Sequence, residues 1–429
     1  MVSTFYTNRR NAVVEARLGG PVRNSGRNAV VRARTGGPVR NSGRNAAVGA
    51  RTGGPARNYG RNAVVEVRRG SLDTYGAISA GSPNIPGSYD QTQLIDMMFN
   101  LNRTKGETVM CKNREYSNPL VEQRADPWVY KHTDGYYYFT ASVPEYDRIE
   151  VRRAASIEGL KEAKPVVAWR KYETGPLSAN IWAPEIHYIS GKWYIYFAAA
   201  RTTETKEGLF DHRMYALENE SANPLEGKWV EKGQVKTAWE TFALDATAFQ
   251  HKGVLYYVWA QKDPDIPGNS NLYISEMENP WTLTGRQTMI ATPEYAWEII
   301  GFSVNEGAAV LNRNGKIFIS FSASATDHNY CMGLLSADED SDLLDAVSWS
   351  KHPEPVFKTS EENGQYGPGH NSFTVNENGE DVMIYHCRNY KEITGDPLYD
   401  PNRHTRAQVL HWNEDGTPNF GVPVKDSGK

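Results

Sequence analysis

Five short segments of this chain each contain one ionisable side chain of a kind that takes part in acid–base catalysis. They are Ala125-Asp126-Pro127, Trp182-Ala183-Pro184-Glu185, Leu244-Asp245-Ala246, Asn305-Glu306-Gly307 and Gly369-His370-Asn371. A carboxyl group can protonate a leaving oxygen while a second carboxylate deprotonates water, and this pair can hydrolyse a glycosidic bond. Gathering several such groups in one place costs free energy that structure alone does not repay. We therefore expect these side chains to form a catalytic site.

The elements that must position these side chains are predicted by a second regular feature. Each segment is followed, after 9, 6, 8, 9 and 9 residues, by a glycine that opens a run of aromatic and β-branched residues; the glycines are Gly135, Gly191, Gly253, Gly315 and Gly379. A polar residue followed by glycine before such a run indicates a hairpin turn. Five copies at a spacing of about sixty residues predict an all-β fold, a five-bladed β-propeller. The first strand of each blade lines the central channel, so the five side chains can converge there.

Composition limits the compartment and the class of protein. The chain has 429 residues, 11% of them aromatic, and only three cysteines, an odd number that argues against a disulfide framework. No run approaches the eighteen or so apolar residues that span a membrane, so no membrane partner is expected. The N-terminus reaches Arg9 and Arg10 without the apolar stretch of a secretory signal. These observations predict a cytoplasmic enzyme.

The N-terminal part has a different repeat and the opposite charge. Arg-Asn-Ala-Val-Val at residues 10–14 recurs, nearly unchanged, at 27–31, 44–48 and 61–65, a period of 17 residues. Residues 1–70 contain 14 Arg, no Lys and two acids, so the remaining residues carry 33 basic and 49 acidic side chains. An arginine-rich arm could bind nucleic acid. Repeats broken by Gly and Pro, in near-identical copies without lysine, instead favour a disordered leader without such a role.

We accordingly expect residues 1–110 to be a disordered leader and linker, and residues 111–429 to form the propeller. No nucleic-acid partner is expected, and removal of residues 1–96 is expected to leave activity intact. The repeats are too short between breaks to predict a packed solenoid.

The carboxylates differ in their local sequence. Asp126 precedes Pro127, which keeps the backbone extended, and Glu306 precedes Gly307, where the chain can approach a substrate closely. Asp245 lies among small and apolar residues, and a buried negative charge beside a glutamate raises the pKa of that glutamate. Each has a plainer interpretation as a turn residue, an exposed loop acid or a core carboxylate bonded to backbone amides.

The chain from about Asn118 to Val424 resembles glycoside hydrolase family 43, whose five-bladed propellers act on fragments of arabinan and xylan. The resemblance rests on the five segments in this order and at blade spacing, the last extended to Gly-Pro-Gly-His-Asn-Ser at 367–372. It implies that Asp126 is the general base, that Glu306 is the general acid and that Asp245 adjusts and orients the acid. It also implies hydrolysis by a single displacement with inversion at the anomeric carbon.

The resemblance extends to further positions. It implies substrate-binding roles for Trp182, as a wall facing the sugar, and for Glu185 as a supporting pocket residue. His328 and Arg388, in late loops, are expected to contact sugar hydroxyl groups. The family places a histidine near an ion on the propeller axis, often calcium, which makes His370 a candidate ligand. Calcium prefers oxygen ligands, so a buried histidine with ordinary hydrogen bonds is the alternative.

Within the family, the chain most resembles the exo-acting α-L-arabinofuranosidases, which implies release of terminal α-L-arabinofuranosyl residues from arabinan or arabino-oligosaccharides, without a required cofactor. A β-xylosidase acting on xylo-oligosaccharides is the alternative within the family. A non-catalytic, sugar-binding propeller is the alternative outside it, although such a protein would not need all three carboxylates. A retaining fructosidase-like propeller is disfavoured, because its Asn-Asp-Pro-Asn signature is replaced here by Ala125-Asp126-Pro127-Trp128.

Overall fold

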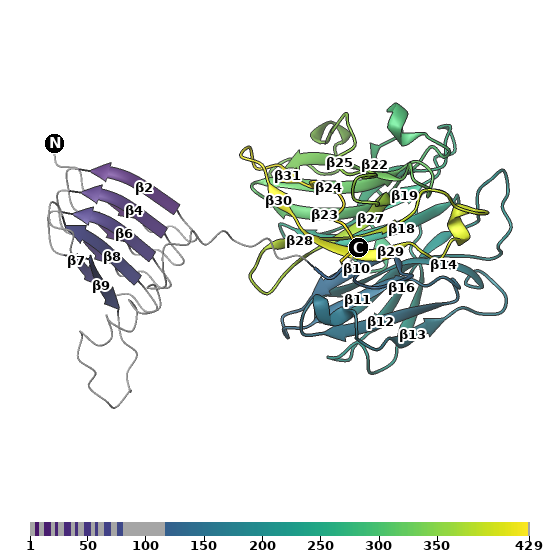
Figure 1. Cartoon of the computed structure of the whole chain (residues 1–429), viewed down its shortest axis with the longest axis horizontal. Coiled ribbons are helices and arrows are strands. Elements are labelled where there is room, and N and C mark those ends of the chain that lie inside the picture. Colours follow the sequence, from purple (N-terminus) through teal and green to yellow (C-terminus); the bar gives the residue numbers. More distant parts are fainter. Residues whose placement is uncertain are drawn as a thin grey trace. The chain divides into compact units, whose positions relative to one another are not determined.

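The computed structural model divides the chain into two units, residues 1–110 and 111–429 (Figure 1). It describes residues 116–427 continuously and, before them, only nine strands between residues 5 and 79.

Eight of the nine strands of the first unit follow the 17-residue repeat, and the ninth, β9, pairs antiparallel with the last of them. One sheet has the order β1 (Phe5–Thr7), β3 (Val22–Asn24), β5 (Val39–Asn41) and β7 (Ala56–Asn58), and the other the order β2 (Val13–Leu18), β4 (Val30–Thr35), β6 (Ala47–Thr52), β8 (Val64–Arg69) and β9 (Tyr75–Ser79). Strands of successive repeats pair in parallel at equivalent positions, as in Val13 with Val30 and Val30 with Ala47. The sequence predicted no such stacking; identical repeats supply one another with backbone partners. The expectation of disorder for the rest of residues 1–110 lies outside the described residues.

The second unit confirms the predicted five-bladed propeller. Blade I consists of β10 (Ala125–Lys131), β11 (Tyr137–Ser142), β12 (Arg148–Ala154) and β13 (Val166–Arg170). Blade II consists of β14 (Ala179–Ile189), β15 (Lys192–Ala200), β16 (Arg213–Asn219) and β17 (Val230–Gln234). Blade III consists of β18 (Ala243–His251), β19 (Val254–Gln261), β20 (Asn271–Asn279), β21 (Thr282–Leu283) and β22 (Thr288–Ala291). Blade IV consists of β23 (Asn305–Arg313), β24 (Lys316–Ala323), β25 (Cys331–Asp338) and β26 (Ser350–Lys351). Blade V consists of β27 (Tyr366–Val375), β28 (Asp381–Arg388) and β29 (His404–Val409).

Short elements complete the unit. They are the hairpin β30 (His411–Trp412) and β31 (Pro418–Asn419) and the 3-10 turns η1 (Glu158–Leu160), η2 (Ala296–Glu298), η3 (Ala346–Ser348) and η4 (Pro397–Tyr399). The five predicted turn glycines all lie between the first and second strands of their blades, with φ between +77° and +90°. Glycine adopts this backbone region without the steric cost that other residues pay.

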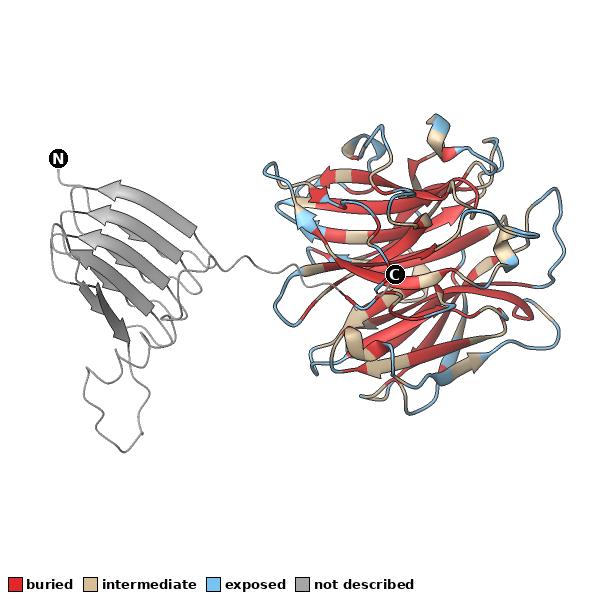
Figure 2. Cartoon of the chain, viewed as in Figure 1, coloured by how far each residue is buried: buried red, intermediate tan, exposed pale blue. Residues whose placement is uncertain are grey.

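The core lies between the blades, and their first strands form the inner ring. β10 contacts β14, β14 contacts β18, β18 contacts β23, β23 contacts β27, and β27 returns to β10. Figure 2 shows that the strands are mostly buried, whereas exposed residues lie mainly in the connecting loops. Large buried aromatic side chains, among them Trp193, Trp259 and Tyr385, fill the space between sheets.

The ring is closed by the segment that precedes blade I. The Leu120 amide donates to the Thr405 carbonyl of β29 at 2.8 Å, and the Thr405 amide donates back to Val121 at 2.9 Å. The Asn118 side chain donates to the Ala407 carbonyl and accepts from the Ala407 amide, at 2.8 and 2.9 Å. Residues from the beginning of the propeller thus pair with the last blade.

Candidate active site

All five innermost strands have a bulge at the same place. The register between the first and second strands shifts at residues 125/128, 182/185, 244/247, 306/309 and 369/372. The first bulged residue has a positive φ in every blade: Asp126 (+52°), Ala183 (+46°), Asp245 (+54°), Gly307 (+59°) and His370 (+43°). A non-glycine residue there costs about 1–2 kcal/mol, and such strain is concentrated at functional sites. The bulge turns each backbone at the channel and redirects its side chain.

These bulges correct the alignment of the five ionisable residues inferred from the sequence. Asp126, Asp245 and His370 occupy equivalent positions, whereas Glu306 precedes its bulge position by one residue and Glu185 follows its own by two. Alternate residues of a strand point to opposite faces, so a shift of one residue changes the direction of the side chain. The spacing to the turn glycine was too coarse to detect this.

A cavity of about 390 Å³ brings four of the five side chains together. Asp126, Asp245, Glu306 and His370 all line it. Another part of its wall is apolar and aromatic, formed by Trp182, Phe210, Phe242 and Phe302. The cavity therefore combines acid–base groups with flat apolar surfaces of the kind that contact sugar rings.

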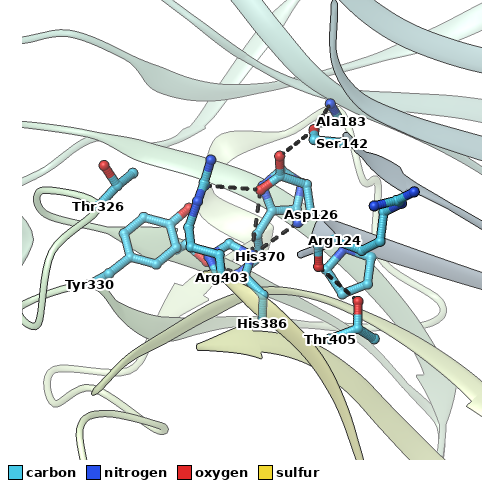
Figure 3. Close-up of polar contacts among 12 residues, drawn as sticks. Arg124, Asp126, Ser142, Ala183, Thr326, Tyr330, His370, His386, Arg403 and Thr405 are labelled. Carbon is cyan, nitrogen blue, oxygen red and sulfur yellow. Dashed lines mark hydrogen bonds and ion pairs between the residues drawn. The ribbon is translucent and has the colours of Figure 1, made fainter. Parts of the chain in front are cut away.

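Asp126 is surrounded by donors and positive charge (Figure 3). Ser142 donates to Oδ2 at 2.6 Å, while Oδ1 lies 3.5 Å from Nη1 of Arg403 and 3.3 Å from Nδ1 of His370. The Asp126 backbone amide donates to Nδ1 of the buried His386 at 3.0 Å. Burial alone would raise the pKa of Asp126, but the neighbouring His370, Arg403 and His386 and the Ser142 hydrogen bond together lower it to about 2. Asp126 is therefore ionised at neutral pH.

The pKa of Glu306 is shifted in the opposite direction. Burial raises its pKa to about 7, in opposition to the hydrogen bond that the Tyr330 hydroxyl donates to Oε1 at 2.8 Å, and the charge of Asp126 adds to the increase. Asp245 is the third member of the group. Burial, followed by the charges of Glu306 and Asp126, raises the pKa of Asp245 well above its usual value, and the Gly307 amide donates to its carboxylate. The negative charge of Glu306 therefore acts on Asp245.

Glycines next to the site make room for its partners. A Cβ on Gly307 would lie 3.0 Å from the His370 ring, and one on Gly369 would lie 2.5 Å from the Tyr330 ring. A Cβ on Gly367 would lie 2.1 Å from the Asp327 carbonyl oxygen, in the loop that leads to Tyr330. The glycines of the Gly-Pro-Gly-His motif thus allow the blade IV loop to lie directly on β27.

The other predicted binding residues divide into one that reaches the cavity and three that do not line it. Trp182 lines the cavity and stacks on His212 with ring centroids 4.0 Å apart. Glu185 is buried away from the cavity, where one carboxylate oxygen lies 3.0 Å from Nε2 of His187. His328 lies in the loop between β24 and β25 but not at the cavity wall. Arg388 does not line the cavity and donates to the carbonyls of Thr326 and Pro397, in two loops of its wall.

His370 lies among carboxylates and not in a set of metal ligands. Its nearest acidic neighbours are Asp126 and, at 3.7 Å, Asp245, both of which line the cavity. In the part of the chain that the structure describes, no group of three or more His, Cys, Asp or Glu side chains is arranged to hold an ion. Calcium near His370 therefore stays a prediction.

Sequence reasoning passed over several residues that the fold brings to the carboxylates. Arg403 and Tyr330 were visible in late loops but gave no signal that distinguished them from their neighbours. Tyr146 and His386 gave none, because contacts such as that of Arg403 Nη2 with the Tyr146 hydroxyl at 2.8 Å join blades that are distant in sequence.

Comparison with known proteins places this site in a family. A model of glycosyl hydrolases family 43 matches residues 116–418. A protein of Streptomyces avermitilis named extracellular exo-alpha-(1->5)-L-arabinofuranosidase is 57% identical over 312 residues, which are 72% of this chain and 64% of that protein. A protein of the same name from Streptomyces chartreusis is 56% identical, over 66% of this chain and 85% of that protein. A crystal structure of alpha-L-arabinofuranosidase from Lactobacillus brevis has 59% identity and a TM-score of 0.72, and the match covers 73% of this chain and 98% of that one.

The expectation of a cytoplasmic enzyme is wrong, since both Streptomyces relatives are named extracellular proteins. The cysteine count misled because Cys331 and Cys387 are buried and free, and buried thiols of this kind act as small apolar side chains in any compartment. Among the described residues, no helix is long and apolar enough to cross a membrane. From the match over residues 116–418 and the identity to these relatives, the chain belongs to glycosyl hydrolases family 43.

Proposed function

We propose that this chain is an exo-acting α-L-arabinofuranosidase that releases terminal arabinofuranosyl residues from arabino-oligosaccharides with inversion. The observation that carries the proposal is that Asp126 and Glu306 line one cavity with different partners, Ser142 and Arg403 at Asp126 and the Tyr330 hydroxyl at Glu306. The pKa of Asp126 is accordingly lowered to about 2, whereas that of Glu306 is raised to about 7. General base and general acid catalysis need one ionised and one protonated carboxyl group at the same pH.

In the proposed reaction, Asp126 accepts a proton from a water molecule, and the water oxygen attacks the anomeric carbon. Glu306 donates its proton to the glycosidic oxygen as the bond to the leaving sugar breaks. Water supplies both the new hydroxyl group and the proton that Asp126 retains, so one proton is left on Asp126 and one is lost from Glu306. Exchange with solvent restores both groups. Asp245 holds the Gly307 amide and thereby orients the backbone next to Glu306.

The names of the relatives support an arabinofuranosyl substrate and exo action on α-(1->5) linkages. The aromatic wall around Trp182 supports stacking against a sugar ring. The chain spans 64% of the length of the Streptomyces avermitilis relative, so what that whole protein does is carried over here as part of the proposal.

Product analysis on arabinotriose and xylotriose tests substrate and stereochemistry together. NMR should show arabinose as the first product, one unit at a time, in the β-configuration before mutarotation, because inversion converts the α-linkage. The Asp126→Asn variant is the matched control and should release no arabinose. Xylose release would favour the β-xylosidase, an α-configured first product would exclude inversion, and sugar binding without hydrolysis would favour a non-catalytic propeller.

A further inference from the structure

Arg388 is a buried arginine at the end of β28 whose guanidinium contacts two loops of the cavity wall. Only 1% of the residue is exposed. Nη1 donates to the Thr326 carbonyl at 2.7 Å, in the loop between β24 and β25 of blade IV. Nη2 donates to the Pro397 carbonyl at 2.6 Å, in the loop between β28 and β29 of blade V. Thr326 and Pro397 both line the cavity, so one side chain fixes two parts of its wall.

The blade V loop is anchored at two further points. Nε of Arg388 donates to Asp400 at 3.1 Å, and the Tyr390 hydroxyl donates to the same carboxylate at 2.7 Å. The Tyr146 hydroxyl of blade I donates to the Leu398 carbonyl at 2.6 Å. The loop thus spans from blade V to blade I and carries its cavity-lining residues with it.

The two loops held by Arg388 also carry the partners of both catalytic carboxylates. The blade IV loop continues from Thr326 to Tyr330, both labelled in Figure 3, and the Tyr330 hydroxyl donates to Glu306. The blade V loop ends at Arg403, which lies against Asp126 and donates to Tyr146. A change in the separation of the loops would therefore move the partner of the acid relative to the partner of the base.

We propose that Arg388 is a positioning residue, whose guanidinium holds the blade IV and blade V loops at the separation that presents the sugar to Asp126 and Glu306. This assignment rests on the proposed function and replaces the direct contact with sugar hydroxyl groups expected for Arg388. Lysine cannot substitute, because an ammonium group is a single point charge and lacks the planar fork that reaches three acceptors on two loops.

Arg388→Lys tests the proposal, with Arg406→Lys as the matched control. Arg406 is an equally buried arginine bonded to Asp426 and to the carbonyls of Cys387 and His404, none of which lines the cavity. R388K is expected to lose about 100-fold in kcat/KM on arabino-oligosaccharides, the size of effect that a displacement of about 1 Å can cause. It should also raise KM and move the alkaline limb of the pH profile upward, because Tyr330 would hold Glu306 less well.

Arg406→Lys should lower Tm but leave KM and the alkaline limb unchanged. Asp400→Asn, a substitution in a partly exposed loop, releases the guanidinium from its acidic anchor and serves if R388K does not fold; it should change KM and the alkaline limb in the same directions. Wild-type KM and pH profile in the folded R388K or D400N protein would overturn the proposal, as would equal changes in R406K. Failure of the wild-type protein to release arabinose would refute the proposed function instead, so the two failures are distinguishable.

Discussion

Two carboxyl groups of one cavity differ in protonation because their immediate partners differ. Asp126 has a hydroxyl donor and an arginine close by, which compensate for its burial. Glu306 has one neutral donor, Tyr330, and lies in the field of Asp126. The effect of burial, which raises the pKa of a carboxyl group, therefore dominates at Glu306 and is outweighed at Asp126. The assignment of acid and base follows from these contacts and agrees with the roles that the family resemblance implies.

Tyr330→Phe is expected to move the alkaline limb of kcat/KM to higher pH. The Tyr330 hydroxyl stabilises ionised Glu306 and lowers its pKa, so removal of the hydroxyl raises that pKa further. The shift should be about one pH unit, as expected for a hydrogen bond to a charged group. Measurement of kcat/KM from pH 5 to 9 checks this. Tyr196→Phe, which removes a buried hydroxyl bonded to the Pro280 carbonyl, is the control and should leave the limb in place. A downward shift in Y330F would contradict the assignment of Glu306 as the acid.

Glu306→Gln is expected to abolish hydrolysis while the folded protein becomes more stable in alkali. The pKa of Glu306 is about 7 in the folded state and 4.5 as the unperturbed value, so the folded state holds its proton more tightly. Wild-type stability from this group is complete below pH 4.5 and is lost as pH rises through 7.

The uncharged glutamine removes this loss. At pH 8, E306Q should exceed the wild type by up to about 3 kcal/mol, the equivalent of the pKa difference. Chemical denaturation at pH 5 and pH 8 measures the effect, and the pH 5 comparison is the internal control. An E306Q protein that is no more stable than the wild type at pH 8 would show that folding does not raise the pKa of Glu306.

At the scale of elements, the sequence predicted the strands and turns better than the shape of the inner strands. The five turn glycines are visible because positive φ there needs glycine, and every one was placed correctly. The bulges were not visible, because Asp126, Ala183 and His370 adopt positive φ although their residue types do not require it. Tertiary packing imposes that conformation, and no local pattern encodes it.

The same reason explains which parts of the site could be predicted. Asp126, Asp245 and Glu306 occur in short motifs on single strands, so their convergence follows from the fold. The partners Arg403 and Tyr330 come from loops whose paths depend on contacts between blades, those of Arg403 with Tyr146 and of Arg388 with the Thr326 carbonyl. Arg388 was predicted to contact the sugar because it lies near a late loop of the chain. The direction of its side chain, however, depends on carbonyl groups of two loops.

Gly369→Ala is expected to reduce kcat by displacing the Tyr330 ring. The new Cβ would lie 2.5 Å from that ring and 2.9 Å from Oγ of Ser322, closer than van der Waals contact allows. We expect a loss of at least about tenfold in kcat, since overpacking of about 1–3 kcal/mol must be relieved beside Glu306. Gly379→Ala is the control: its φ of +81° costs about 1 kcal/mol of stability, but nothing lies within 4 Å of the new Cβ. An unchanged kcat in G369A, measured on an aryl arabinofuranoside, would mean that Tyr330 has no part in supporting Glu306.

At the scale of the whole propeller, the site depends on closure of the ring. Asp126 lies on β10 of the first blade, whereas His370, His386 and Arg403 come from blade V and its last loop. The first and last blades therefore share the environment of the base, and any opening between them would separate Asp126 from its positive neighbour. The segment that pairs with β29, residues 118–121, holds together this seam between blade I and blade V.

Asn118→Ala is expected to loosen the seam and to destabilise the propeller. The Asn118 side chain, 2% exposed, makes two hydrogen bonds with Ala407 that imitate the pairing of a further strand. Their loss leaves a buried amide and a buried carbonyl of β29 without these partners, at a cost of about 2–3 kcal/mol.

Thermal unfolding should show Tm lowered by several degrees, and the alkaline limb set by Glu306 should not move, since Tyr330 and Glu306 both belong to blade IV. Asn413→Ala, which removes contacts within an exposed hairpin, is the control and should change Tm little. A wild-type Tm in N118A would show that the backbone pairing of Leu120 and Val121 with Thr405 keeps the first and last blades together without this side chain.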